Sequence, residues 1–275
     1  MNYKTIGKTI NLVAKVSPAL AQKISFKLFT TPRPRKQKPK EVEFLNTATK
    51  KTITVDELQV QTYIWGHSAR KILFAHGWES NAGRWRSFIP DLVDAGFEVV
   101  AFDAPGHGAS GGKTLHLVIY MATIQAIFSE LGPFEAIVGH SMGAGAAVMA
   151  LATKELRHPD KLVLLGSFSE VSEVYRSYAQ MLGLSPKLEK EFNKTIKKLS
   201  GYNVSYFSVA DKASTLTDIK GLVIHDKQDQ TIDVNEARNI AQQWALAKYV
   251  ETDGAGHSLQ NRTIFKEVIS FLATA

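Results

Sequence analysis

Gly139-His140-Ser141-Met142-Gly143 is the most informative motif in this chain of 275 residues. A short apolar run, residues 136–138, precedes it, and a run of small residues, 144–152, follows it. This order predicts a strand, a tight turn with Ser141 at its apex, and a helix. The flanking glycines have no Cβ, so the strand and the helix can pack closely around the bend. The same residues also fit a glycine-rich turn with a solvated serine. The rest of the sequence is needed to distinguish these two interpretations.

Short apolar runs alternate with helical stretches along most of the chain. The solidly apolar runs occupy residues 72–75, 99–102, 136–138, 162–165 and 222–224, with a last strand near 248–251. Helical stretches are expected at 83–95, 114–131, 142–157, 233–246 and 259–272. Strands that are buried on both faces and alternate with helices predict an α/β fold with a mostly parallel sheet. Residues 42–44, 51–55 and 60–65 instead alternate at period two, which predicts antiparallel strands at one edge.

The sequence suggests a domain organisation with two additions to this sheet. Residues 1–40 are a basic N-terminal arm, helical over 2–29 with a break near Ser17-Pro18, and extended over the proline-rich residues 31–40. Residues 41–275 then form the main domain. Two helical runs within about 167–218 do not fit the alternation, and we expect them to form a small helical cap inserted after the sixth strand.

Charge and composition exclude several classes of function. The arm carries ten Lys and Arg and no acid, whereas the remainder carries 23 basic and 26 acidic side chains, so the net charge of +7 belongs to the arm. A nucleic-acid-binding body is therefore not indicated. The chain has no cysteine, which excludes disulfides, thiolate metal sites and a cysteine nucleophile. No apolar run is long enough to span a bilayer.

Three residues far apart in the sequence have the chemistry of a proton relay. Catalysis by a serine needs a base within hydrogen-bond reach and a third group that orients the base. Ser141, Asp229 and His257 each follow the end of a predicted parallel strand, where open α/β sheets place their sites. Asp226 and Asp233 compete with Asp229 for the role of the acid. The other seven histidines are expected to orient loops or lie at the surface, and none shows the spacing of a metal ligand pair.

Several motifs together make the chain resemble the α/β-hydrolase fold superfamily, in particular its serine esterases and lipases. They are residues 74–78, 102–108 and 139–143, the loop around Asp229, and Gly256-His257. The resemblance covers about residues 41–275 and implies a mostly parallel eight-stranded sheet flanked by helices.

The resemblance also implies a role for each site residue. Ser141 would be the nucleophile, His257 the general base and then acid, and Asp229 the orienting carboxylate. The backbone N–H groups of Trp78 and Met142 would form the oxyanion hole.

The expected activity is hydrolysis of a small, modestly apolar ester-like molecule through an acyl-serine intermediate, without a cofactor or metal. A carboxylesterase or small lipase is the first expectation. A thioesterase, an amidase or peptidase, a hydrolase of C–C bonds and a non-catalytic ligand-binding protein remain alternatives. Residues expected to line the substrate pocket are His76, Gly77, Phe168, Tyr175 and Tyr178.

Two interpretations of the arm remain open. A basic amphipathic helix followed by a basic linker could lie on an anionic membrane, which gives peripheral membrane contact through residues 1–40. Alternatively, the helix packs on the body and the linker is solvated. The sequence thus predicts a cytoplasmic protein, with membrane association as the open alternative, and it does not predict an oligomeric state.

Overall fold

The computed structural model describes residues 3–153 and 156–274, which divide into two compact units. Unit 1 combines the described residues up to Thr31 with Glu170–Ser208. Unit 2 combines Pro32–Ser169 with the described residues from Val209 onward. The N-terminal helices and the inserted helices therefore belong to the same unit, whereas the sequence predicts them as separate segments.

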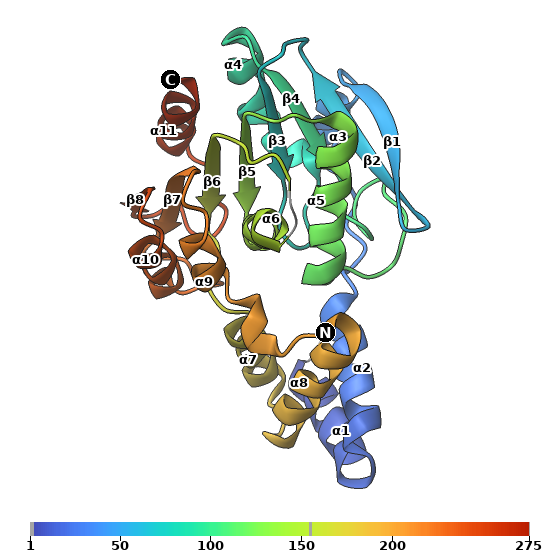
Figure 1. The fold of residues 1–275 in the computed structure, drawn as a ribbon. Helices are drawn as coiled ribbons and strands as arrows, with labels where there is room; N and C mark the ends of the chain where they lie inside the picture. The colour runs from blue at the N-terminus through green and yellow to red at the C-terminus, as the bar shows by residue number, and fades with distance from the viewer. Residues whose placement is uncertain (1–2, 154–155, 275) are drawn as a thin grey trace. The chain divides into compact units, whose positions relative to one another are not determined.

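An eight-stranded sheet forms the centre of unit 2, in the order β1-β2-β4-β3-β5-β6-β7-β8 (Figure 1). The strands are β1 (Thr49–Val55), β2 (Leu58–Trp65), β3 (Lys71–Ala75), β4 (Glu98–Phe102), β5 (Ala136–His140), β6 (Lys161–Leu165), β7 (Lys220–Asp226) and β8 (Ala247–Thr252). Strands β3 to β8 pair in parallel, whereas β1 and β2 add an antiparallel edge beside β4. The predicted mostly parallel sheet with an antiparallel edge is confirmed.

Helices cover both faces of this sheet (Figure 1). In unit 2 they are α3 (Pro39–Leu45), the 3-10 helix η1 (Ala82–Ser87), α4 (Ile89–Asp94), α5 (Leu117–Leu131), α6 (Met142–Thr153), α9 (Val209–Ser214), α10 (Val234–Gln243) and α11 (Arg262–Ala273). The apolar core on one face joins alternate residues of the strands to η1, α4 and α11. On the other face α5, α6, α9 and α10 contact one another in turn. Within the described residues, no helix combines the length and apolar character that crossing a bilayer requires.

The prediction of a strand at residues 42–44 is wrong, because these residues lie in α3. Pro39 occupies the first turn of this helix, where its missing N–H costs nothing. The backbone N–H of Lys38 donates to the Glu41 carboxylate over 3.0 Å, which caps the start of the helix. The extended linker is consequently shorter than predicted and ends before Pro39.

The described residues of unit 1 form four helices and one short turn of helix. They are α1 (Tyr3–Val16), α2 (Pro18–Thr30), α7 (Val171–Leu182), α8 (Lys187–Ser200) and η2 (Val204–Phe207). The predicted break at Ser17-Pro18 is confirmed: the Ser17 side chain accepts the N–H of Leu20 over 3.3 Å and caps α2. The Asn11 side chain of α1 bonds to the backbone of Gly183 and Ser185, so it ties α1 to the turn that follows α7.

Aromatic rings fill the interior of unit 1. Tyr175 stacks on Phe192 with 3.6 Å between ring centroids and meets Phe29 edge-on at 5.7 Å. Its hydroxyl donates to the Gln22 side chain over 3.0 Å. The Tyr178 hydroxyl donates to a backbone carbonyl of α2 over 3.0 Å. Packing within unit 1 thus accounts for two of the five residues expected to line the pocket.

We predict that Gly7→Ala loosens unit 1, because a Cβ at this position would overlap the carbonyl oxygen of Leu182 in α7. Overpacking of this kind typically costs about 1–3 kcal/mol. Hydrogen exchange of peptides from α1 and α7 should become faster. Thr9→Ala, an exposed change on the same helix, is the control and should leave exchange unchanged. Equal protection in Gly7→Ala and the wild type would contradict this packing.

Candidate functional site

Ser141 sits on the turn between β5 and α6 with a left-handed backbone, at φ +53°. This conformation is costly for a residue with a side chain, and it turns the hydroxyl out of the strand direction. The N–H of Ser141 donates to Leu165 O over 2.8 Å, which anchors the turn to β6. A Cβ on Gly139 would come within 2.5 Å of Ala144 Cα, and one on Gly143 would overlap β3. The two glycines are therefore required for the close approach at this turn.

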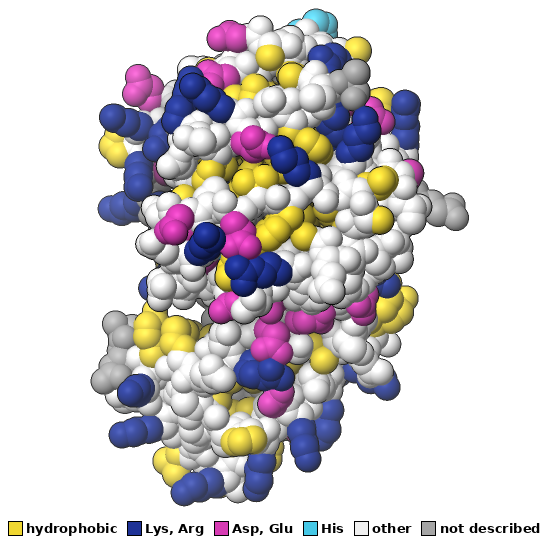
Figure 2. Space-filling model, turned by 90° about the vertical axis from the view of Figure 1, so that its left-hand side faces the viewer, with side chains coloured by type: hydrophobic (Ala, Val, Ile, Leu, Met, Phe, Trp, Pro, Cys, Tyr) yellow, Lys and Arg dark blue, Asp and Glu magenta, His cyan; other side chains and the backbone are white. Residues whose placement is uncertain are grey.

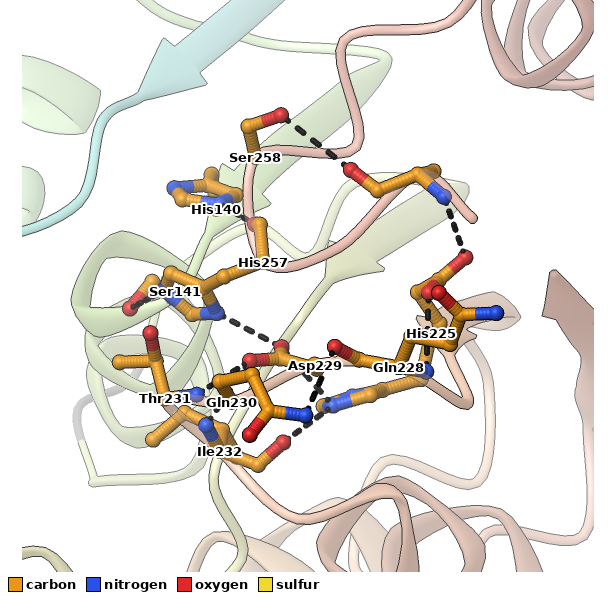
Figure 3. Close-up of polar contacts among 12 residues, drawn as sticks. His140, Ser141, His225, Gln228, Asp229, Gln230, Thr231, Ile232, His257 and Ser258 are labelled. Carbon is orange, nitrogen blue, oxygen red and sulfur yellow. Dashed lines mark hydrogen bonds and ion pairs between the residues drawn. The ribbon is translucent and has the colours of Figure 1, made fainter. Parts of the chain in front are cut away.

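The structure brings Ser141, His257 and Asp229 into one hydrogen-bonded row (Figure 3). His257 Nδ1 lies 2.7 Å from Asp229 Oδ2, and His257 Nε2 lies 3.0 Å from Ser141 Oγ. Because a carboxylate only accepts, Nδ1 carries the proton, and the lone pair of Nε2 faces the serine hydroxyl. The Asp229 side chain is 1% exposed and that of His257 is 23% exposed, so solvent reaches the row from the histidine end.

The Asp229 carboxylate is held by several donors at once. Its Oδ1 accepts the N–H groups of Thr231 and Ile232 over 2.7 and 3.0 Å. Its Oδ2 faces His257 and also lies 3.2 Å from His225 Nε2. Burial alone would raise the pKa of Asp229, but the hydrogen bonds from the two histidines and the loop outweigh it and hold the pKa below its usual range. Asp229 is therefore ionised at neutral pH.

The two rival acids have other partners. Asp226 accepts the hydroxyl of Thr252 and the N–H of Ala255, over 2.7 and 2.8 Å, and so joins the end of β7 to the end of β8 and the loop that follows it. Asp233 accepts the N–H of Asn235 over 2.8 Å and caps α10. Among the described residues, neither carboxylate bonds to His257.

The loop after β3 lies directly against the serine turn. A Cβ on Gly77 would come within 2.7 Å of His140 Nδ1 and 3.0 Å of Ser141 Cβ, so only glycine fits here. Trp78 follows Gly77 in the chain, and Met142 follows Ser141 at the start of α6, where backbone N–H groups have no partner within the helix. The two amides expected to form an oxyanion hole thus belong to loops in contact with each other.

Histidines of the motifs hold these loops in place. His76 is fully buried, donates from Nδ1 to Gly77 O over 2.7 Å and accepts the N–H of Ala104 over 2.9 Å. His140 Nε2 donates to His257 O over 2.7 Å. Burial, with smaller contributions from Arg84 and His257, holds the pKa of His140 well below its usual range, so it stays neutral. The loop-orienting role predicted for these histidines is confirmed.

Two further residues support the site, and the sequence predicts such a role for one of them, His225. The Arg84 guanidinium is buried, lies 4.7 Å above the Trp85 ring and donates to Ser258 O over 2.9 Å, beside His257. Burial lowers the pKa of Arg84 to about 9. His225 donates from Nε2 to Ile232 O over 2.9 Å and faces the Asp229 carboxylate. The position of His225 at the end of a predicted strand indicates its role in orienting the loop that follows. Nothing in the sequence around Arg84 indicates a contact with the loop that carries His257.

The remaining residues of the expected pocket are mostly enclosed. Phe168 is buried with its ring against α6, where a Cβ on Gly145 would come within 2.6 Å of it. Of the five residues expected to line the pocket, Gly77 lies directly against Ser141, because a Cβ at position 77 would come within 3.0 Å of Ser141 Cβ. In the described part of the chain, no group of three or more His, Asp or Glu side chains is arranged to hold a metal ion.

Relatives of known name match parts of this chain. A non-heme haloperoxidase of Rhodococcus erythropolis is 36% identical over 106 residues, which is 38% of each chain. A monoacylglycerol lipase of Mycolicibacterium smegmatis is 33% identical over 133 residues, 44% of this chain and 47% of that one. A putative esterase/lipase of Mycoplasma pneumoniae is 33% identical over 155 residues, 54% and 52% of the two chains. The matches thus span about half or less of these relatives' length.

Solved structures share the fold at low sequence identity. An esterase from Exiguobacterium antarcticum superposes with a TM-score of 0.64 at 17% identity, over 82% of this chain and all of that one. A bromoperoxidase from Bacillus anthracis gives 0.62 at 17% identity, over 82% and 99%. The sequence itself matches the Alpha/beta hydrolase family over residues 72–263, from β3 into the start of α11. The parallel sheet, the serine turn and this match together place the chain in the α/β-hydrolase family.

Proposed function

We propose that this protein is a serine hydrolase that cleaves a carboxylic ester or a similar bond through an acyl-serine intermediate. The observation that carries the proposal is the row of hydrogen bonds from Ser141 Oγ to His257 Nε2, 3.0 Å, and from His257 Nδ1 to Asp229, 2.7 Å. A hydroxyl, a neutral imidazole and an ionised carboxylate in this order form the arrangement that activates a serine as a nucleophile.

In the first half-reaction the hydroxyl of Ser141 attacks the carbonyl carbon of the substrate, and His257 Nε2 takes the hydroxyl proton. The ionised Asp229 stabilises the imidazolium that forms and fixes the orientation of the ring. The negative charge that develops on the carbonyl oxygen is bound by the N–H groups of Trp78 and Met142. Two preorganised donors of this kind each contribute roughly 10²–10³-fold in rate.

The intermediate then collapses and the leaving group departs. His257 gives its proton to the leaving oxygen, and the acyl group remains on Ser141. In the second half-reaction His257 removes a proton from water, the hydroxide attacks the acyl carbon, and the serine leaves with the proton from His257. The products are one carboxylic acid and one alcohol, and the enzyme returns to its starting protonation state.

The names of two relatives favour an ester as the first substrate class. They are a monoacylglycerol lipase and an esterase/lipase. We therefore place a small, modestly apolar carboxylic ester first. Thioesters, amides and C–C bonds next to carbonyls use the same residues and are distinguished by assay.

Ser141→Ala should reduce turnover of p-nitrophenyl esters by at least about 10⁴-fold, because the nucleophile is lost while the fold remains. A panel of p-nitrophenyl esters, acyl thioesters and anilides, run with the wild type and the variant, measures this and ranks the substrate classes. Ser258→Ala, which changes an exposed serine beside His257, is the matched control and should keep near wild-type turnover. Turnover that survives in Ser141→Ala would refute the proposed nucleophile, and a wild type inactive on every substrate would favour a ligand-binding protein.

Asp229→Asn should lower the free energy of unfolding at pH 7 by about 2 kcal/mol, since charge-assisted hydrogen bonds of this kind are typically worth that much. The folded-state pKa of Asp229 is depressed, so its contribution is present above the ordinary Asp pKa of about 4 and is lost as the pH falls toward the folded-state value. Urea unfolding of the wild type and Asp229→Asn, at pH 7 and near pH 3, measures this. The difference between their free energies of unfolding should be smaller at the lower pH.

The matched control is Asp233→Asn, because asparagine caps a helix as well as aspartate does. It should change stability little at either pH. A stability difference between the wild type and Asp229→Asn that does not depend on pH would contradict an ionised Asp229 in the folded protein.

A further inference from the structure

The positive charge of this protein is concentrated in unit 1. Unit 1 holds eleven Lys and Arg against four Asp and Glu, a net charge of +7, and the 22 basic and 22 acidic side chains of the remaining chain cancel. Among the described Lys and Arg residues of unit 1, Arg176 and Lys194 form ion pairs with acidic side chains. The other nine lysines have no acidic partner among the described residues. In Figure 2, dark-blue Lys and Arg side chains project along the edge of the lower part, with yellow apolar side chains between them.

Apolar side chains are exposed beside these lysines on the hairpin formed by α1 and α2. Leu12 is 64% exposed and Val16 is 90% exposed, while Leu20 and Ile24 are 51% and 43% exposed. All four lie within about two helical turns of the bend at Ser17. The two pairs are each spaced i, i+4, so each pair lies on one outward face of its helix. The inward faces are occupied by other residues, such as Ile10 and Ala21.

Lysines share these outward faces. Lys8 and Lys15 lie on the same side of α1 as Leu12, and Lys23 and Lys27 lie on the same side of α2 as Leu20. All four are exposed. We call these four lysines, with Leu12, Val16, Leu20 and Ile24, the hairpin surface.

We propose that the hairpin surface docks on an anionic lipid membrane. Aliphatic side chains at the tip can enter the boundary between headgroups and acyl chains, while the surrounding lysines remain at the level of the phosphates. The surface has no acidic residue, so its charge complements a negatively charged leaflet. A nucleic acid would satisfy the lysines but offers nothing to four exposed aliphatic side chains, which lack the aromatic faces on which bases stack.

Co-sedimentation of the full chain with vesicles tests this proposal. The probes are vesicles of phosphatidylcholine alone and of phosphatidylcholine mixed with phosphatidylglycerol. We expect binding to the mixed vesicles that weakens at high salt, because exposed charges are screened. One lysine near a membrane contributes about fivefold in affinity, so Lys15→Gln with Lys23→Gln should weaken binding on the order of 25-fold. Leu12→Gln with Val16→Gln should weaken binding to the same vesicles without changing its salt dependence.

Matched controls come from unit 2. Leu246→Gln changes an apolar side chain of similar exposure, and Lys113→Gln with Lys266→Gln removes two exposed lysines without an acidic partner among the described residues. These variants should bind as the wild type does, and hydrolysis of a water-soluble ester should be unchanged in all variants. Absence of binding to the mixed vesicles, equal binding by all variants, or tighter binding to single-stranded RNA than to the vesicles would overturn the proposal.

A second inference concerns the loop that carries Trp78. The next residue, Glu79, has a left-handed backbone at φ +50°, which is costly for a residue with a side chain. Its N–H donates to His107 Nε2 over 3.0 Å. Arg33 donates to the Glu79 carboxylate from its backbone N–H and its guanidinium, over 2.5 to 3.0 Å, and Arg35 donates to Glu79 O over 2.9 Å. The hydrogen bonds from Arg33 are the main reason why the pKa of Glu79 lies below its usual range.

We infer that Arg33 and Glu79 are positioning residues for the Trp78 N–H, an inference that rests on the proposed function. The peptide group of Glu79 follows Trp78 directly, so the partners that hold its strained backbone also fix the direction of the preceding amide. A displaced oxyanion donor weakens binding of the transition state more than binding of the substrate. The basic linker is therefore expected to affect the rate of the chemical step.

Arg33→Ala should lower kcat on the best ester of the panel by about tenfold while KM changes by less than about twofold. Exchanging the charges, Arg33→Glu with Glu79→Arg, should restore part of the loss. The matched control is Arg70→Ala, which removes a similar two-bonded pair with Glu135 elsewhere in unit 2 and should leave kcat unchanged. An active wild type with unchanged kcat in Arg33→Ala would overturn this inference alone. An inactive wild type would overturn the proposed function and this inference with it.

Discussion

The left-handed backbone of Ser141 is the constraint around which the site of unit 2 is arranged. At φ +53° the chain leaves β5 and enters α6 within one residue, so the hydroxyl is presented at the end of the sheet. The glycines at 139 and 143 permit this approach because any Cβ there would collide with α6 or β3. The turn is strained by itself, and it persists because the N–H of Ser141 is bonded to β6 and the surrounding apolar core is closely packed.

Two loops complete the site, and hydrogen bonds between them fix their mutual position. Asp226 links the end of β7 to the loop after β8, and His140 ties the backbone of His257 to the serine turn. Arg84 donates a hydrogen bond to the next carbonyl, that of Ser258. Supporting bonds of this kind reduce the freedom that a site loses when a substrate binds, which is what preorganised catalysis requires. The same bonds explain why several polar side chains are buried here.

Local patterns in the sequence predicted most elements of the fold and the three residues of the hydrogen-bonded row. The apolar runs and the glycine turn succeeded because period and composition reflect burial directly. The prediction of a strand at residues 42–44 was wrong because a short alternating run fits a strand and a capped helix equally well. The cap formed by Glu41 stabilises the helix. The pairing of α1 and α2 with α7 and α8 could not be predicted, since it depends on contacts between segments more than a hundred residues apart. The supporting role of Arg84 could not be predicted for the same reason, since its partner Ser258 lies far away in the sequence.

The proposed function depends on the activation of Ser141 as a nucleophile by His257. Labelling of the full chain with a fluorophosphonate, followed by peptide mapping, tests it most directly, because such probes react with serines whose hydroxyl is activated in this way. We expect one adduct per chain, on Ser141, formed rapidly in the wild type and at least about a thousandfold more slowly in His257→Ala. An adduct on another serine, or labelling of Ser141 at the same rate without His257, would contradict it.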